Sequence, residues 1–246
     1  MVIDSHTHLY RGWANVKGVD PRKMIDGLKA AGVDKSILMT IDGLFGDCPK
    51  HNDELAALAS EFPDELIAFG TVNPYEGDKA VEELRRCVRQ LGMKGMKFHP
   101  WLQAFSLTHP TMNDIASECG QLGVPIVFHD GTPPYASTPQ AANLADNHPE
   151  TTIILGHSGL HDQWHDAVRW GEKLSNLYFC THGTPFVSLC RLAERVGPER
   201  MLFGSDSGFG GEQVVLYDLD MVYSLPISDS DKEKILGGNA VRLLGI

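Results

Sequence analysis

The feature that most constrains the fold is a repeated unit. A short apolar, β-rich run, a polar or Gly/Pro-containing loop and an amphipathic helical stretch follow one another eight times. The strands are expected at Val2–His8, Val33–Thr40, Leu66–Asn73, Met93–His99, Val124–His129, Thr151–His157, Leu177–His182 and Met201–Asp206. Successive strand ends are about 30 residues apart, the length of one βα unit. Eight such units predict an α/β fold, a single (β/α)8 TIM barrel.

Signals for helix starts and ends fall where this repeat needs them. Asp20-Pro21 opens a helix that Gly32 closes, and Ser137 caps another before the chain reaches Asn147. The last helix is expected over Asp231–Leu244. The helices therefore alternate with the strands, as a barrel requires.

The length of 246 residues fits one barrel domain spanning residues 1–246, and no linker or low-complexity tract interrupts it. An open doubly wound sheet would usually have fewer strands and a phosphate-binding glycine loop after the first strand. Here the first strand is followed by His8-Leu9-Tyr10-Arg11. The open sheet is therefore disfavoured.

The charge balance restricts the partners. Lys and Arg number 21 against 32 Asp and Glu, a net charge of −11, which argues against nucleic acids and anionic membranes. No run approaches the roughly 18 apolar residues of a membrane span, and an acid at Asp4 is unlike a secretory signal. The five cysteines form no CxxC motif. We expect a cytoplasmic protein that acts on a small molecule.

Six of the eight expected strands finish in a residue that can bind a metal or carry a proton: His8, His99, His129, His157, His182 and Asp206. The active site of a barrel lies at the carboxyl ends of its strands, so residues distant in the sequence converge there. This clustering predicts an active site with a metal ion.

The pair His6 and His8 is the centre of that prediction. Side chains alternate across a strand, so both imidazoles should point into the barrel and could chelate one cation, with Asp4 one layer below. Further ligands are needed, and His129 and Asp206 are the natural candidates. The alternative, a hydrogen-bonded pair of core histidines, is disfavoured because further independent groups of this kind lie at other strand ends.

At this point the sequence resembles the amidohydrolase superfamily, in particular the branch of amidohydrolase-related proteins and nonoxidative decarboxylases typified by aminocarboxymuconate semialdehyde decarboxylase. The resembling segments are Ile3-Asp4-Ser5-His6-Thr7-His8, Gly95-Met96-Lys97-Phe98-His99-Pro100, Val127-Phe128-His129-Asp130-Gly131, Leu155-Gly156-His157-Ser158-Gly159, Phe203-Gly204-Ser205-Asp206 and Gly238-Asn239-Ala240-Val241-Arg242-Leu243-Leu244. They extend over essentially the whole chain.

The resemblance implies metal ligands at His6, His8, His129 and Asp206, and a His157 that acts on water or substrate. The sequence alone leaves open whether His157 is instead a fourth imidazole ligand. Two positions depart from the family pattern: Asp130 stands where a small hydroxylated residue commonly follows the histidine, and His182 ends the seventh strand. Neither departure removes a predicted ligand.

Lys97 and His99 lie two residues apart and should both face the barrel interior. For Lys97, three alternatives remain open: a carbamylated bridge between two metals, an ammonium paired with Asp4 or a substrate carboxylate, or a lysine whose end reaches solvent. His99 is a predicted substrate contact. Arg11 and Trp101 follow strands at the mouth and suit a flat or acidic substrate, and His182 is a further candidate substrate contact.

These observations predict a hydrolase with one divalent ion, Zn²⁺ or alternatively Mn²⁺, acting on a small amide, ester or lactone. Metal-bound water would attack, with Asp206 and His157 as the catalytic residues that transfer the proton. The rival hypothesis is a nonoxidative decarboxylase of an aromatic or muconate-like acid with the same ligands. A barrel that binds metal without turnover is a third alternative.

An outer helix offers one candidate homodimer contact, at the apolar residues Val214, Val215, Leu216 and Tyr217. Packing of this helix on the barrel would explain the same residues equally well.

Overall fold

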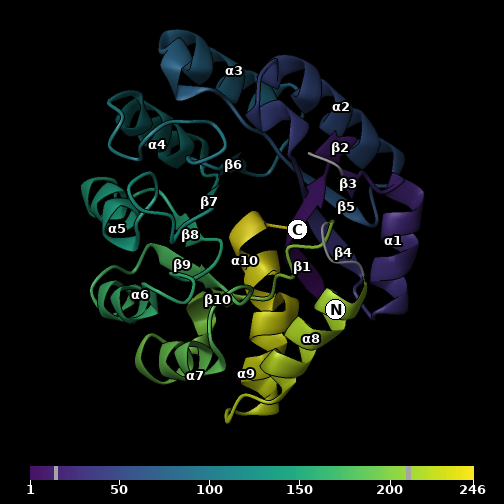
Figure 1. Cartoon of the computed structure of the whole chain (residues 1–246), viewed down its shortest axis with the longest axis vertical. Coiled ribbons are helices and arrows are strands. Elements are labelled where there is room, and N and C mark those ends of the chain that lie inside the picture. The colour runs from purple at the N-terminus through teal and green to yellow at the C-terminus, as the bar shows by residue number, and fades with distance from the viewer. Residues whose placement is uncertain (14–15, 209–211) are drawn as a thin grey trace.

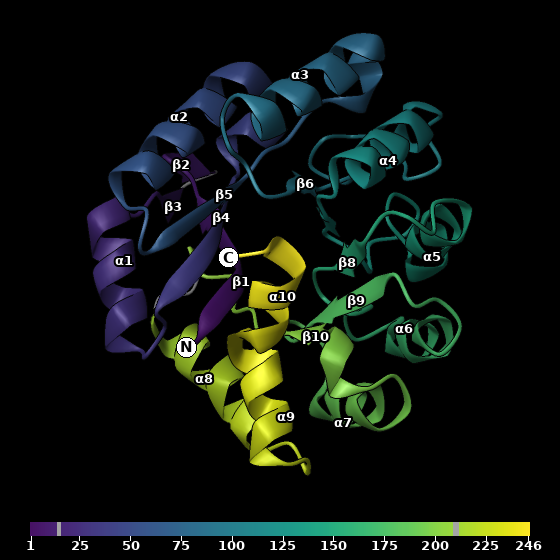
Figure 2. The same cartoon turned by 180° about the vertical axis from the view of Figure 1, so that it is seen from behind.

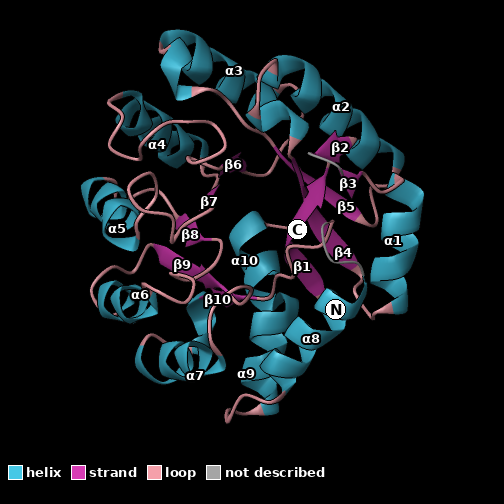
Figure 3. Cartoon of the chain, viewed as in Figure 1, coloured by secondary structure: helices cyan, strands magenta, loops and turns pink. Residues whose placement is uncertain are grey.

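The computed structural model, which describes residues 1–13, 16–208 and 212–246, has eight parallel strands in a ring with helices outside (Figures 1 and 3). The barrel strands are β1 (Ile3–Leu9), β4 (Lys35–Thr40), β5 (Leu66–Phe69), β6 (Met96–Phe98), β7 (Ile126–Phe128), β8 (Ile153–Leu155), β9 (Leu177–Cys180) and β10 (Met201–Leu202). Each of these strands begins within the range expected from the sequence. The predicted (β/α)8 TIM barrel is confirmed.

The ring consists of two sheets joined at two seams. One sheet has the order β1-β4-β5 and the other β10-β9-β8-β7-β6. Parallel bridges pair Thr7 with Ser207 and Gly70 with Met96. At these seams the His8 amide donates to the Ser207 carbonyl at 2.7 Å, and the Lys97 amide to the Gly70 carbonyl at 2.7 Å. These bonds close the barrel.

Among the described residues, eight helices surround the strands (Figures 1 and 2). They are α1 (Pro21–Ala30), α2 (Cys48–Glu61), α3 (Asp78–Arg89), α4 (Thr111–Leu122), α5 (Thr138–Asn147), α6 (Trp164–Gly171), α7 (Phe186–Arg195) and α8 (Glu212–Tyr223). Both predicted caps are confirmed: Asp20 accepts from the Lys23 amide, and Ser137 forms a reciprocal capping box with Gln140.

Several short elements were not expected from the sequence. Two short strands, β2 (Gly12–Trp13) and β3 (Val16–Lys17), pair antiparallel after the first barrel strand. Single 3₁₀ turns η1 (Asp42–Leu44), η2 (Pro74–Glu76) and η3 (Pro198–Arg200) lie in other connections. No described helix is long and apolar enough to cross a membrane.

The expected last helix is divided in three: α9 (Asp229–Glu233), a π-helical turn η4 (Lys234–Gly238) and α10 (Asn239–Leu244). Instead of joining the outer ring, α10 lies across the centre of the barrel (Figure 2). The turn brings Gly237 so close to the first residue that a Cβ there would lie 2.4 Å from the Met1 carbonyl oxygen. Only glycine permits this approach.

The barrel floor is an apolar layer made of inward-facing residues at every second strand position. It comprises Ile3, Ile37, Met39, Ile67, Phe69, Val127, Ile154, Tyr178 and Leu202, covered by Ala240 and Leu244 of α10. Alternate residues such as Leu38, Phe98 and Phe128 pack in a second layer between strands and helices. The floor therefore supports the mouth above it with neutral, closely packed side chains.

The first strand departs from simple alternation. Its pairing with β4 shifts between Asp4 and Thr7, so Ile3 takes the inner position below the two histidines. The expectation that Asp4 lies there is wrong. The Asp4 carboxylate instead accepts from the His6 amide at 3.1 Å, the Ser205 amide at 3.0 Å and the Ser205 hydroxyl at 2.5 Å. It therefore ties β1 to the segment after β10.

The apolar stretch proposed as a dimer contact divides between two environments. Val215 is buried against the barrel, whereas Leu216 and Tyr217 are exposed. Packing thus accounts for part of the pattern, and a homodimer stays a prediction.

Candidate active site

Six of the eight barrel strands, β5 to β10, end earlier than the sequence predicts, and this places five of the predicted site residues on loops. His99 and His129 each come directly after the last strand residue, while His157, His182 and Asp206 follow by two to four positions. His6 and His8 lie within β1 itself. Backbone leaving a strand can turn its side chains toward the barrel axis, so these residues surround the mouth.

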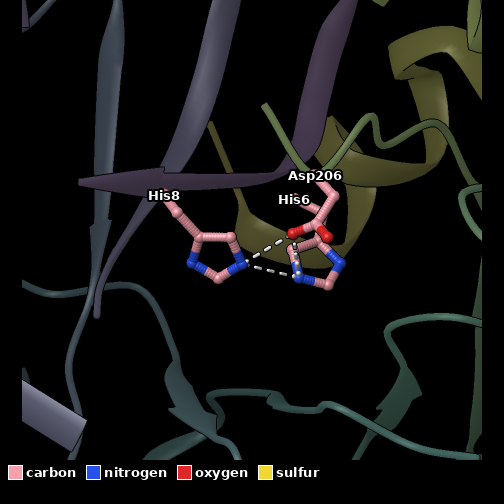
Figure 4. A group of neighbouring side chains, drawn as sticks. All are labelled: His6, His8 and Asp206. Carbon is pink, nitrogen blue, oxygen red and sulfur yellow. Dashed lines mark hydrogen bonds and ion pairs between the residues drawn. The ribbon is translucent and has the colours of Figure 1, made fainter. Parts of the chain in front are cut away.

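A compact group forms from His6, His8 and Asp206 (Figure 4). The Nε2 atoms of the two imidazoles lie 3.1 Å apart, and Asp206 Oδ1 lies 2.8 Å from His8 Nε2 and 3.6 Å from His6 Nε2. His6 Nδ1 lies 3.1 Å from the Gly156 carbonyl, which requires a proton on Nδ1 and leaves the Nε2 lone pair facing the group. This donor set fits a divalent metal ion.

Asp206 is held in an unusual backbone conformation, with a φ of 54° in the left-handed region. Burial alone would raise the pKa of its carboxyl. The hydrogen bond from His8 and the charges of the surrounding imidazoles outweigh burial and hold the pKa well below its usual range. The carboxylate is therefore ionised and ready to bind a cation.

Lys97 is buried beside this group, with Nζ 3.0 Å from His6 Nε2. Its side chain is 1% exposed, so the alternative of a lysine reaching solvent is wrong. Among the described residues no ion pair joins it to Asp4, which rules out that partner. Burial lowers the pKa of Lys97 to about 8, although Asp206 partly opposes the change. A substrate carboxylate or carbamylation remains open for this amine.

His129 does not belong to either of the two candidate metal-binding groups found in the described part of the chain. Its Nδ1 lies 2.8 Å from His157 Nε2, and its ring stacks on His99 with centroids 3.7 Å apart. Burial and the nearby Lys97 lower the pKa of His129 to about 3, so the ring is neutral. Its role as a metal ligand stays a prediction.

Asp130, the first departure from the family pattern, positions the loop that carries His157. Its two carboxylate oxygens accept from the His157 amide at 2.7 Å and the Gly159 amide at 2.6 Å. Burial raises the pKa of Asp130 to about 6, although these bonds oppose the rise. The sequence identified Asp130 as a departure from the family pattern but did not reveal its hydrogen-bond partners.

His182, the second departure, joins the site through a residue that sequence reasoning missed. Its Nδ1 lies 2.8 Å from Asp218 Oδ2, and its Nε2 lies 3.8 Å from Asp206 Oδ2. Asp218 is buried on α8, on the same face as Val215 and Val222. An acid on the apolar face of a helix was the signal that could have identified it.

This acid also changes the charge of His182. Burial alone would lower the pKa of the imidazole, but Asp218 and Asp206 outweigh burial and raise it. Of the imidazoles around Asp206, this ring is therefore the one most readily protonated.

Trp101 and Arg11, both predicted at the rim of the barrel mouth, lie in different surroundings. Trp101 is 54% exposed and its ring centroid lies 6.2 Å from that of His99, so it borders the site. The exposed Arg11 forms an ion pair with Glu54 of α2, which also contacts His51. The structure thus places Trp101 next to the predicted substrate contacts and directs Arg11 toward α2.

Comparison with known proteins adds independent information. The chain is 24% identical to 2-amino-3-carboxymuconate-6-semialdehyde decarboxylase of Dictyostelium discoideum, over 92% of this chain and 77% of that protein. It is 25% identical to gamma-resorcylate decarboxylase of Rhizobium sp. (strain MTP-10005), over 78% of this chain and 74% of that protein.

A solved structure shares the barrel. The dihydroxybenzoic acid decarboxylase of Polaromonas sp. JS666, with bound manganese and 2-nitroresorcinol, superposes with a TM-score of 0.80 at 18% identity, over 99% of this chain and 96% of that one. The likeness supports the fold described above.

These relatives correct one prediction. The sequence favoured a hydrolase, but the curated relatives are decarboxylases, so the hydrolase prediction is wrong and its rival is favoured. The physical reason is that the same imidazoles and carboxylate can hold a metal for either reaction, so the ligands alone do not choose between them. The broader prediction of an enzyme is supported.

The family resemblance seen in the separate motifs extends along the whole chain. The family model described as amidohydrolase matches residues 3–246, which include both the β1 histidines and the α10 segment below them. This protein is a member of the amidohydrolase family.

Proposed function

We propose that this protein is a metal-dependent nonoxidative decarboxylase of a small aromatic or muconate-like carboxylic acid. The observation that carries the proposal is the convergence of His6, His8 and Asp206 beside the buried amine of Lys97. A cation and an adjacent ammonium suit an anionic substrate. The activities of the curated relatives support the same chemistry.

The metal would be held by His6, His8 and Asp206, with His129 as the predicted fourth ligand. When bound, the ion supplies positive charge that holds a substrate oxygen and stabilises negative charge formed in the reaction. Imidazole and carboxylate ligands suit Zn²⁺, and Mn²⁺ is the alternative.

The substrate would lie between these ligands and the rim. Lys97 would pair with its carboxylate, while His99 and His182 would contact its polar groups. Trp101 offers a flat apolar face at the entrance. Arg11, which pairs with Glu54 in the free protein, would act only on a substrate that extends to the rim.

Decarboxylation breaks the bond between the carboxyl carbon and the adjacent carbon, and the electron pair stays on the adjacent carbon. One proton must replace the CO₂ that leaves, and because Asp206 is ionised, this proton must first be taken up from solvent. We assign this transfer to Asp206 and His157, because Asp206 faces the metal ligands and the Nε2 of His157 lies at the mouth beside His129. Asp130 would keep His157 in place through its backbone amide.

The test is a reaction in D₂O with 2,6-dihydroxybenzoate as the first substrate and other aromatic or muconate-like acids after it. For this reaction the protein is first loaded with one equivalent of Zn²⁺ or Mn²⁺. We expect stoichiometric CO₂ and one deuterium at the carbon that lost it. Label from H₂¹⁸O in a product acid, without CO₂, would contradict decarboxylation. Absence of turnover across the panel would instead favour the non-catalytic barrel.

A further inference from the structure

The two oxygens of Asp206 face different groups of histidines. Oδ1 lies 2.8 Å from His8 Nε2, in the group with His6, whereas Oδ2 lies 3.8 Å from His182 Nε2. A carboxylate with each oxygen turned to a separate imidazole cluster can bridge two cations. The second cluster is therefore a candidate site in its own right.

That cluster consists of His157, His182 and Asp206, whose ligand atoms all lie within 4.8 Å of one another. The two imidazole rings have centroids 5.7 Å apart and an interplanar angle of 63°. Two imidazoles and one carboxylate are a common donor set for divalent first-row metals. The donors come from three different strand-to-helix loops, so they approach one point from different sides.

Asp218 prepares His182 for this role. Its carboxylate, 2.8 Å from His182 Nδ1, fixes the proton of a neutral ring on that nitrogen and leaves the Nε2 lone pair directed at Asp206. A carboxylate, a histidine and a metal are commonly arranged in this order, with the carboxylate orienting the ring. Asp218 is buried on α8 and, among its described contacts, has no other hydrogen-bonded side chain.

His157 supplies a second, independent observation. It is 2% exposed, and its Nδ1 has no hydrogen-bond partner among the described residues. Gly183 lies beside this nitrogen, and a Cβ there would be only 3.0 Å from it. A buried polar atom without a partner is unfavourable, so the described residues leave the hydrogen-bonding capacity of this ring incompletely satisfied.

We propose that His157, His182 and Asp206 form a second site for a divalent first-row metal, bridged to the first through Asp206. It should be the weaker site, because the two cations share one carboxylate and repel each other. Under the proposed function it is also inhibitory, since a cation on His157 prevents this imidazole from transferring the proton.

The test counts Mn²⁺ bound per chain by equilibrium dialysis and elemental analysis over rising free Mn²⁺. We expect one tightly bound ion and then a second, with an exchange-broadened electron paramagnetic resonance signal from the bridged pair. His182→Asn should bind one ion only. The matched control His161→Asn, at an exposed position outside both groups, should bind two.

Asp218→Asn provides a second variant in case His182→Asn misfolds, which circular dichroism will report. Removing the orienting carboxylate should weaken the second ion about 10- to 100-fold and leave the first unchanged. Saturation of the unaltered protein at one ion, or two ions in both variants at unchanged affinity, would overturn the second site. The count needs no turnover, so it stands apart from the proposed decarboxylation. Falling turnover above one equivalent of Mn²⁺ would support inhibition.

Discussion

The floor and the mouth of this barrel are formed by the same set of strands, but the floor buries apolar side chains and the mouth buries ionisable ones. The floor buries apolar side chains from all but one of the barrel strands and covers them with α10. The mouth buries ionisable groups at distances near 3 Å, including His6, His8 and Lys97. Lys97 lies at the boundary between floor and mouth, because it is in register with Val127, which belongs to the floor. The comparison teaches that the floor provides stability and the mouth provides reactivity at a cost in stability.

The largest expected effect is at the mouth. His6→Ala combined with His8→Ala removes two of the three converging donors, so stoichiometric metal and turnover should both be lost. Elemental analysis measures the metal and circular dichroism the fold. About one tightly held ion in the double variant would contradict the assignment.

A smaller effect is expected for His157→Asn. The first ion should persist because His6, His8 and Asp206 remain, while turnover should fall about 10²- to 10⁴-fold through loss of a proton-transfer group. Metal content and kcat are measured on the same preparation. Loss of the tightly bound ion would show that His157 is a ligand of the first metal.

The floor should give the opposite pattern. Phe69→Ala removes a fully buried ring and should lower the free energy of unfolding by about 3 to 5 kcal/mol, measured by urea denaturation. Metal stoichiometry should stay unchanged in the folded variant. Unaltered stability together with less bound metal in this variant would contradict the assignment of stability to the floor and of metal binding to the mouth.

The smallest effect concerns pH. The pKa of Lys97 is lowered to about 8 from 10.5, so between these values the unfolded chain binds more protons and stability rises with pH. Lys97→Met removes the cost of burying the ammonium. The metal-free variant should therefore exceed the unaltered protein by up to about 3 kcal/mol at pH 7, with the difference shrinking toward pH 10. Urea denaturation at several pH values measures this. A difference independent of pH would show that Lys97 is neutral throughout.

The sequence predicted those features that depend on local pattern. The eight strands, the caps at Asp20 and Ser137 and the pair His6 and His8 all follow from periodicity and spacing. Asp4 was misplaced because the irregularity in β1 arises from its pairing with β4, which the strand's own residues do not reveal.

Other parts of the site depend on contacts between distant segments. Asp218 lies 36 residues from His182, and Asp130 lies 27 residues from the His157 amide that it accepts from. No local pattern specifies such partners. The reaction itself was predicted wrongly because a metal-binding donor set is shared by hydrolases and decarboxylases, and the choice depends on the substrate.

The position of α10 has a consequence for the order of folding. Gly237 must fit against Met1, and Ala240 and Leu244 must settle on a layer that includes Ile3, so these contacts join segments more than 230 residues apart. Closing so long a loop costs only slightly more entropy than closing a shorter one, but contacts of this range form slowly. The floor helix should therefore dock late in folding, as should the seam between Thr7 and Ser207, because both sets of contacts join the two ends of the chain.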